Sequence, residues 1–254
     1  MRVIPVLDLR AGRAVLAREG RRESYAPVRS VLTGSETGAG DAVALARVYR
    51  DALGLADCYV ADLDAIGGGP VQTGLLRQIA GLGSTLLVDA GVTDAARARA
   101  VRAAGAAQVV VGLETLPSFE ALAAVACAVG AERVVFSLDL RDGAPLVRPG
   151  VAAGATPLEL AREAVAAGAA SLLVLDLARV GTGRGVDATL LHALRRAHPT
   201  AELLAGGGVS GAPDLARLAD VGLDGVLVAT ALHDGRLGRA DLEAARSGHP
   251  SDSR

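Results

Sequence analysis

Two short segments of the chain carry the same carboxylate in the same setting. Residues 4–12 read IPVLDLRAG and residues 135–143 read VFSLDLRDG. In each segment an apolar run ends on an aspartate, Asp8 or Asp139, and an Arg and a Gly follow shortly after. Two carboxylates at one site can divide acid–base work, because one accepts a proton while the other, kept protonated, supplies one. Asp8 and Asp139 are therefore the first candidates for catalysis.

Other carboxylates also follow apolar runs. Asp176 ends the run SLLVLD, and we expect it to act with the catalytic pair, whereas Asp89 ends TLLVD and is expected to face the substrate. Asp62 or Asp64 holds a similar position in VADLDAI. Such an acidic set could also hold Mg²⁺ through oxygen ligands. No His follows an apolar run in this way, which argues against a His-built zinc site, and we expect no resident metal or organic cofactor.

Glycine-rich segments in the second half have the composition of a phosphate-binding site. Backbone N–H groups of such turns, next to a helix N-terminus, donate to phosphate oxygens. The alternative is that these glycines only permit tight packing of strand against helix. The candidate phosphate-binding residues are Gly206, Gly207, Gly208, Ala229, Thr230, Thr182 and Gly183.

The elements that must position these residues alternate along the chain. We predict strands at 2–8, 58–63, 85–89, 107–112, 133–138, 171–176, 202–206 and 224–229. We predict helices at 41–54, 71–82, 93–104, 117–129, 156–168, 186–197, 211–221 and 238–247. The strands are almost continuously apolar, as in a parallel sheet buried on both faces. Eight such units in 254 residues predict an α/β fold, a (β/α)8 TIM barrel, with a doubly wound open sheet as the alternative.

The second half of the chain repeats the first. VADLDAIGGG at 60–69 resembles VLDLARVGTG at 174–183, just as residues 4–12 resemble residues 135–143. The fold is therefore predicted to be two fused half-barrels. A twofold barrel places the two repeated aspartates at the carboxyl ends of opposite strands, and that rim carries the chemistry in this fold.

The repeat also locates an insertion. Matching segments lie 131 residues apart at the first strand but 117 apart at the third and fourth, so the first half carries extra residues within 13–40. We expect residues 1–247 to form one domain, with half-barrels at about 1–130 and 131–247, and residues 248–254 to be a disordered tail.

The inserted segment is rich in arginine. A long loop in a compact barrel is usually a lid or a binding loop, and Arg21 and Arg22 are our candidates for substrate contact. The alternative is a solvated, charged hairpin. The arginines of this segment are Arg13, Arg18, Arg21, Arg22 and Arg29.

Composition excludes several classes of partner. A net charge of −2 provides no global attraction for nucleic acid or an anionic membrane, and three Tyr, two Phe and no Trp leave few aromatic side chains on which bases could stack. No signal peptide is visible, so we expect a cytoplasmic protein. Cys58 and Cys127 lack metal spacing and are expected to be buried thiols. The expected partner is a small phosphorylated molecule, and the oligomeric state stays open.

Together, the segments IPVLDLRAG, YVADLDAI, VFSLDL, VGTG, AGGGVS and GVLVATAL resemble the histidine-biosynthesis isomerase and cyclase family (HisA and HisF) over about residues 1–240. The resemblance implies an isomerase that opens a phosphoribosyl ring and converts an aminoaldose to an aminoketose. In that family two acidic residues act as base and acid, without metal or organic cofactor. Asp8 and Asp139 match the paired aspartates by position.

The departures from the family pattern bear on the substrate. Leu175 and Val180 stand where the isomerase has a Thr and a catalytic Asp, and Asp89-Ala90-Gly91 replaces a Gly-Gly-Gly phosphate cradle. A carboxylate at 4 Å would repel a phosphate by about 4 kcal/mol in a partly buried site. We therefore expect the first-half phosphate site to be lost or remade, unless the inserted arginines compensate.

These departures make the chain resemble a HisA/HisF-related subfamily of organisms that use methanopterin-type one-carbon cofactors. The predicted function is isomerisation of a phosphorylated sugar or aminosugar in one-carbon cofactor metabolism rather than histidine biosynthesis. A Mg²⁺-assisted lyase or epimerase and a non-catalytic ligand-binding barrel are the alternatives. His233 follows the last predicted strand and is expected either to approach the ligand or to lie on the surface.

Overall fold

The computed structural model describes residues 1–17, 19, 24–33, 38–148, 151–183, 185 and 187–247. Arg18, Arg21 and Arg22 of the inserted segment lie outside the described residues, as does the predicted tail at 248–254. The predictions made for them stay predictions.

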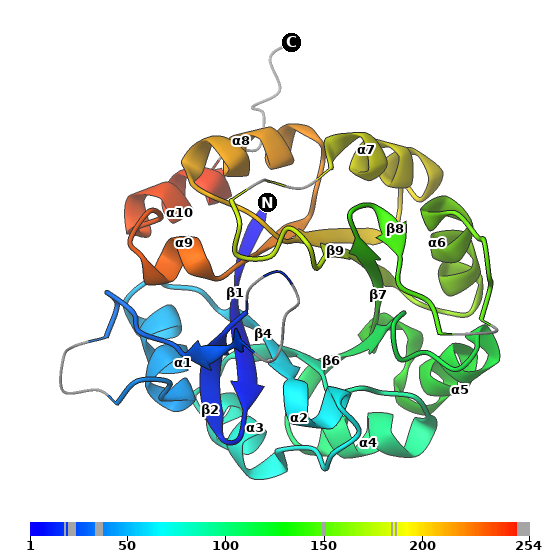
Figure 1. Ribbon diagram of the computed structural model, residues 1–254, viewed down its shortest axis with the longest axis horizontal. Coiled ribbons are helices and arrows are strands. Elements are labelled where there is room, and N and C mark those ends of the chain that lie inside the picture. The colour runs from blue at the N-terminus through cyan, green and yellow to red at the C-terminus, as the bar shows by residue number, and fades with distance from the viewer. Residues whose placement is uncertain are drawn as a thin grey trace.

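Within the described residues, eight parallel strands close into a barrel (Figure 1). Each strand pairs with the next, and β11 returns to pair in parallel with β1. The strands are β1 (Arg2–Arg10), β4 (Asp57–Asp62), β5 (Thr85–Asp89), β6 (Ala106–Gly112), β7 (Val134–Arg141), β9 (Ser171–Asp176), β10 (Glu202–Gly206) and β11 (Gly225–Val228). The predicted (β/α)8 fold is confirmed, and each predicted strand lies within a few residues of an observed one.

Helices surround the barrel, as the apolar stripes predicted. They are α1 (Ala42–Asp51), α3 (Thr73–Ala80), α4 (Ala95–Ala103), α5 (Phe119–Val129), α6 (Pro157–Ala166), α7 (Ala188–Ala197), α8 (Ala212–Asp220) and α10 (Arg239–Ser247). Local caps begin several of them: Thr156 and Glu159 form a capping box at α6, and Asp41 accepts from the Ala44 N–H at α1. No helix in the described part of the chain is long and apolar enough to cross a membrane.

The barrel interior forms a small core of its own, separate from the layer between strands and helices. Inward positions recur at every second residue of each strand, and apolar side chains fill them. This inner cluster comprises Ile4, Tyr59, Ala61, Leu87, Val110, Val135, Leu173, Leu204 and Leu227. It makes the barrel solid below its mouth, so a ligand can enter only at the rim.

The two repeated segments, residues 4–12 and 135–143, each lead into a β-hairpin of the same kind. After β1 the chain turns at Ala11 and Gly12, with φ of 48° and 76°, into β2 (Arg13–Leu16). After β7 it turns at Asp142 and Gly143, with φ of 51° and 79°, into β8 (Ala144–Pro145). Two consecutive left-handed residues are typical of a type I′ hairpin turn. The sequence analysis did not predict these short antiparallel strands, but they extend the predicted half-barrel repeat to the turns.

The inserted segment is tied to the barrel rim. Its described part includes β2 and β3 (Ala26–Pro27), which form an antiparallel ladder beside β1. The Glu19 N–H donates to the Val180 carbonyl at 2.9 Å, in the loop after β9. The Val31 N–H donates to the His233 carbonyl at 2.9 Å, beyond β11. The segment therefore joins the rim at positions distant in sequence, as a binding loop would.

One expectation about the cysteines is wrong. Cys58 is buried on β4, as predicted, and burial raises its thiol pKa well above the usual value. Cys127, in contrast, is exposed on α5. Its helix presents a buried face through Leu122, Val125 and Val129, and position 127 falls outside that face. An Ala-rich helix gives little contrast between its faces, which is why sequence alone misplaced this thiol.

Candidate active site

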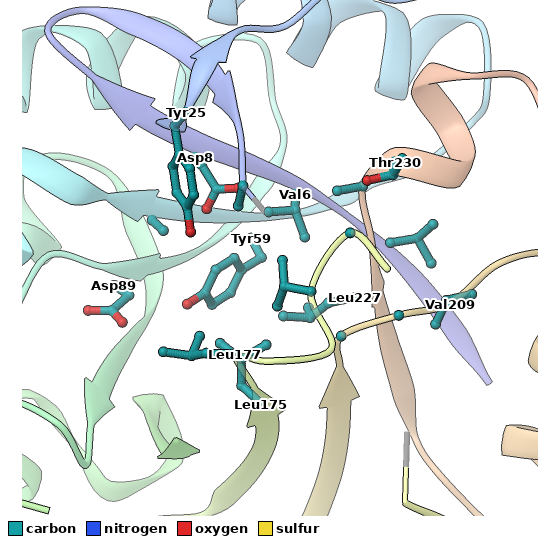
Figure 2. Close-up of a pocket in the computed structure, with 18 of the residues that line it drawn as sticks. Val6, Asp8, Tyr25, Tyr59, Asp89, Leu175, Leu177, Val209, Leu227 and Thr230 are labelled. Atoms are coloured by element: carbon teal, nitrogen blue, oxygen red, sulfur yellow. The ribbon is translucent and has the colours of Figure 1, made fainter. Parts of the chain in front are cut away.

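A pocket opens at the carboxyl ends of the barrel strands. Figure 2 shows Asp8, Tyr59 and Asp89 toward one end and Thr230 and Val209 toward the other. Predicted residues from both halves of the chain meet here. Asp8, Asp89, Asp139, Gly183, Gly207, Gly208, Ala229 and Thr230 all line the pocket.

Asp139 is held in a protonated state by its surroundings. It is only 4% exposed at the end of β7. One carboxyl oxygen accepts from the Ser137 hydroxyl at 2.6 Å, and the other accepts from the Glu114 N–H at 3.2 Å. Burial, opposed by the Ser137 hydrogen bond and reinforced by the charges of Asp89 and Glu114, raises the pKa of Asp139 to about 8. At neutral pH this carboxyl is available to donate a proton.

Asp8 lies on the strand opposite Asp139. Around the barrel, β1 and β7 are separated by three strands in either direction. Asp8 pairs with Val15 of β2 on one side and with Ala61 of β4 on the other, so its backbone is fixed by two ladders. The predicted pair of aspartates thus lines one pocket from opposite strands.

Asp89 occupies the position of the altered first-half turn. Its carboxylate accepts from the Gly91 N–H at 3.0 Å, so a loop amide of the kind that binds phosphate is bonded to the protein itself. A Cβ placed on Gly112 would lie 3.0 Å from an Asp139 oxygen and 3.6 Å from an Asp89 oxygen. The two carboxyl groups therefore approach each other above Gly112.

The second-half glycines form turns that only glycine tolerates. Gly207 and Gly208 have φ of 103° and 80°, and Gly183 has φ of 71°. A Cβ on Gly207 would lie 3.0 Å from the Asp176 carbonyl oxygen. Close to these turns, α9 (Thr230–His233) begins directly after β11. Small residues and backbone amides thus line this end of the pocket.

Two predicted phosphate residues do not line the pocket. A Cβ on Gly206 would lie 3.0 Å from Leu227 and 3.1 Å from Leu175, so this glycine makes room for apolar side chains. The Thr182 hydroxyl donates to the Arg179 carbonyl at 2.7 Å. Gly206 therefore fits the alternative given above, in which a glycine permits tight packing. The Thr182 hydroxyl stabilises the turn that contains it.

Asp176, predicted to be catalytic, is turned into a loop. Its carboxylate accepts from the N–H groups of Asp142 and Gly143 at 3.1 and 3.0 Å and from that of Ala178 at 3.1 Å. Arg179 lies 3.4 Å away as an ion pair. Asp176 does not line the pocket. Its hydrogen bonds assign it to holding the β7–β8 turn.

The corresponding turn of the first half is held by different residues. The N–H groups of Ala11 and Gly12 donate to Asp64 at 2.7 Å and to Gln72 at 3.0 Å. Asp62 accepts from the Ala65 and Gln72 N–H groups. These carboxylates, considered above as magnesium ligands, are used by loops, and the described residues contain no group of three or more His, Cys, Asp or Glu able to hold a metal.

The structure adds residues that the sequence analysis missed. Tyr59 and Glu114 line the carboxylate end, and Tyr25 of the inserted segment lines the pocket as well (Figure 2). Arg236 lines the pocket near Gly183, with its guanidinium 3.9 Å from where a Cβ would be. Inward alternation along β4 could have found Tyr59. A loop arginine such as Arg236 carries no comparable signal.

His233 has neither of the positions expected for it. It is 5% exposed and does not line the pocket. One ring nitrogen lies 3.1 Å from the Tyr49 hydroxyl of α1 and the other 3.1 Å from the Ser30 hydroxyl of the inserted segment. Burial lowers its pKa to about 4, so the ring is neutral at pH 7. His233 joins α9, α1 and the inserted segment.

Comparisons with known proteins place this geometry in context. The family described as "Histidine biosynthesis protein" matches residues 2–238. A protein of Deinococcus radiodurans is 34% identical over 238 residues, covering 92% of this chain and 94% of its own length. A protein of Rubrobacter xylanophilus is 35% identical over 257 residues, covering 97% of each chain. Both are named as imidazole-4-carboxamide isomerases, and the name of their substrate includes two phosphoribosyl groups.

A further relative carries no named activity. It is an uncharacterized protein of Methanocaldococcus jannaschii, 30% identical over 246 residues and covering 96% of each chain. Similarity along the whole chain therefore extends both to named isomerases and to a protein of unstated reaction.

Proposed function

The chain belongs to the histidine biosynthesis protein family, and from this premise we propose that it is an isomerase of a phosphorylated sugar or aminosugar that works by carboxylate acid–base catalysis. The observation that carries the proposal is that Asp8 and Asp139, from opposite strands, line the same pocket as the glycine turns after β10 and β11. One end supplies proton transfer and the other supplies backbone amides for a phosphate.

The geometry divides the chemical work. A phosphate at the glycine end would accept from the turn amides, with the Arg236 guanidinium nearby. Asp139, protonated at neutral pH, donates a proton to the ring oxygen as the ring opens. Asp8 removes a proton from the carbon next to the resulting imine, and the electron pair left behind forms the enaminol. Tautomerisation of the enaminol then yields the ketose.

The substrate we propose differs from that of the histidine isomerases. Leu175 and Val180 line the pocket where the family resemblance implies a hydroxyl and a carboxylate. This wall is apolar, so contacts that the histidine substrate would make are missing. We propose a related phosphorylated aminosugar, in one-carbon cofactor metabolism. The methanopterin-type resemblance supports this, and the relative from Methanocaldococcus jannaschii is compatible with it.

Hydrogen exchange tests the proposal whichever product the reaction gives. Purified protein is incubated in D₂O with 5-phosphoribosylamino compounds, and exchange of the C2 hydrogen is followed by NMR. Asp8→Asn and Asp139→Asn should each lower the rate roughly 10²-fold or more, the scale of general acid–base catalysis. Asp51→Asn, a change at a side chain that is 62% exposed on α1, should leave it unchanged.

Three results would contradict this assignment. Full exchange by either active-site variant would remove that aspartate from the chemistry. Binding of every compound without exchange would indicate a ligand-binding barrel. Activity that appears only on addition of Mg²⁺ would indicate a metal-assisted lyase or epimerase.

A further inference from the structure

His233 lies between two parts of the pocket lining. It ends α9, the short helix whose first residue, Thr230, lines the pocket. The inserted segment contributes Ala17 and Tyr25 to the same lining. His233 itself is 5% exposed, does not line the pocket and has no part in the proposed acid–base chemistry. Its burial between α9 and the inserted segment indicates that it connects them.

Each ring nitrogen of His233 has a partner on a different element. Nε2 lies 3.1 Å from the Tyr49 hydroxyl of α1, and that hydroxyl lies 3.3 Å from the Val6 carbonyl of β1. Nδ1 lies 3.1 Å from the Ser30 hydroxyl of the inserted segment. A neutral imidazole has one donor and one acceptor, so both of its nitrogens are used here. Nε2 therefore faces the barrel, and Nδ1 faces the segment.

The segment meets the ring through a turn. The Ser30 hydroxyl accepts from the Leu32 N–H at 3.2 Å, and the Thr33 hydroxyl donates to the Ser30 carbonyl at 3.3 Å. Directly after the serine, the Val31 N–H donates to the His233 carbonyl at 2.9 Å. The side chain and the backbone of His233 thus contact two consecutive residues of the segment.

A second attachment lies on the other side of Tyr25 in the chain. The Glu19 N–H donates to the carbonyl of Val180, a residue that lines the pocket. Tyr25 is thus flanked by one anchor at Glu19 and another at His233. Because the chain between the anchors carries part of the pocket lining, loss of either anchor should let Tyr25 shift relative to the pocket.

We propose that His233 is a positioning residue, which acts through Ser30 to hold the inserted segment at the pocket and so keeps Tyr25 in the pocket lining. The ring can do this because Tyr49 fixes it on the barrel side while it fixes Ser30 on the other. A protein whose segment is displaced lacks part of its lining, so its apparent affinity falls with the fraction of molecules in which the segment is in place. The inference applies to any ligand that extends to Tyr25, whatever the reaction.

Nuclear magnetic resonance of isotope-labelled tyrosine rings tests the proposal. The chain has three Tyr, so the ring signals are few and can be assigned with Tyr25→Phe and Tyr59→Phe variants. The Tyr49 signal reports contact with the imidazole, and the Tyr25 signal reports the position of the segment. His233→Phe should move both, the Tyr25 signal toward its position in the urea-unfolded protein. A Tyr25 signal that stays in place would overturn the proposal, because the ring would then only fill space.

Two polar variants separate the two sides of the ring. An Asn amide ends near the position of Nδ1, whereas a Gln amide reaches the position of Nε2, and each can donate and accept. His233→Asn should keep the contact with Ser30 and leave the Tyr25 signal near its natural position. His233→Gln should keep only the contact with Tyr49 and move the Tyr25 signal as His233→Phe does. The reverse order would overturn the proposal.

Two further variants complete the test. Ser30→Ala removes the contact from the segment side and should also move the Tyr25 signal, which decides the matter should His233→Phe not fold. Thr156→Ala removes the N-cap of α6, which lies across the barrel from α1 and α9 (Figure 1), and lowers stability by about 1 kcal/mol. It should leave the Tyr25 signal unchanged. An equal shift in Thr156→Ala would attribute the effect to lost stability and overturn the proposal.

The hydrogen-exchange assay measures the consequence for a ligand, and this part rests on the proposed function. His233→Gln should raise KM about fivefold, the effect of one lost hydrogen bond, and leave kcat within about twofold, because Asp8 and Asp139 are unchanged. A fall in kcat at unchanged KM would contradict a role in binding. Absence of exchange in the natural protein would reject the isomerase, while the Tyr25 signal would still decide the role of His233.

Discussion

At the scale of single residues, two similar aspartates have different surroundings. Asp139 and Asp176 both end barrel strands, and both are buried. Asp176 accepts from three backbone N–H groups and forms an ion pair with Arg179. Asp139 receives two hydrogen bonds and faces further carboxylates, so burial prevails and the proton stays. The chemistry proposed for Asp139 follows from this difference in environment.

This protonation predicts a pH dependence of stability. The pKa of Asp139 is about 8 in the folded protein, compared with an ordinary value of 3.8. Between these values the unfolded chain releases a proton that the folded chain keeps, so stability falls as pH rises through this window and levels off above it. Asp139→Asn should remove the contribution, up to about 1.4 kcal/mol per pH unit. Urea unfolding at about pH 5 and about pH 8.5 measures it.

The variant is expected to fold, because an amide satisfies the same partners. Its N–H can donate to the Ser137 oxygen, and its carbonyl can accept from the Glu114 N–H. Asp51→Asn on the surface is the control and should retain the natural pH dependence. An identical pH dependence in Asp139→Asn and the natural protein would show that Asp139 is ionised across this range.

At the scale of elements, the two halves share a backbone plan but differ at their loops. Both β1 and β7 continue through a left-handed turn into a short antiparallel strand. The turns after β5 and β10 differ, because Asp89 bonds the Gly91 N–H whereas the later turn exposes Gly207 and Gly208 to the pocket. The two halves therefore share a backbone plan but differ in the turns that face the pocket.

This difference predicts where an anion binds. Crystals grown in sulfate should show an anion at Gly207, Gly208 and Thr230, because backbone N–H groups of such glycine-rich turns can donate to anions, and none beside Asp89. Asp89→Asn removes the charge and should allow a second anion, which makes it the matched comparison. Anion density of equal occupancy beside Asp89 in the natural protein would show that both halves bind an anion and would contradict this prediction.

At the scale of the whole molecule, the inserted segment and the loop after β9 both contribute to the pocket. The segment reaches the loops after β9 and β11 through Glu19 and Val31, and it brings Tyr25 to the pocket. Leu175 and Val180 add apolar side chains to the pocket lining. The resemblance implies a Thr and a catalytic Asp at these two positions, so the chain differs there from the pattern expected of its family.

This difference predicts the outcome of genetic complementation. Single-copy expression in a strain that lacks the histidine-pathway isomerase should give little or no growth without histidine, because Leu175 and Val180 lack the polar groups that the resemblance implies. The matching isomerase from Deinococcus radiodurans serves as the positive control. Robust growth from this chain would show that its substrate is that of the histidine pathway.

The sequence by itself determined the barrel and the meeting of Asp8 with Asp139. Apolar runs, helix caps and turn glycines act locally, so each element could be predicted from its own residues. The carboxyl ends of all parallel strands in a barrel lie at the same rim, so aspartates at those ends were expected to lie near one pocket.

Only the tertiary structure decided what each side chain does there. Asp176 turned into a hairpin because the amides of Asp142 and Gly143 reach it from another strand. His233 became buried because Ser30 and Tyr49 pack against it from distant segments. Tyr59 lines the pocket because its side chain points inward from β4, beside carboxyl groups that come from other strands. Hydrogen-bond partners and burial arise from contacts between residues far apart in the chain, which no local pattern encodes.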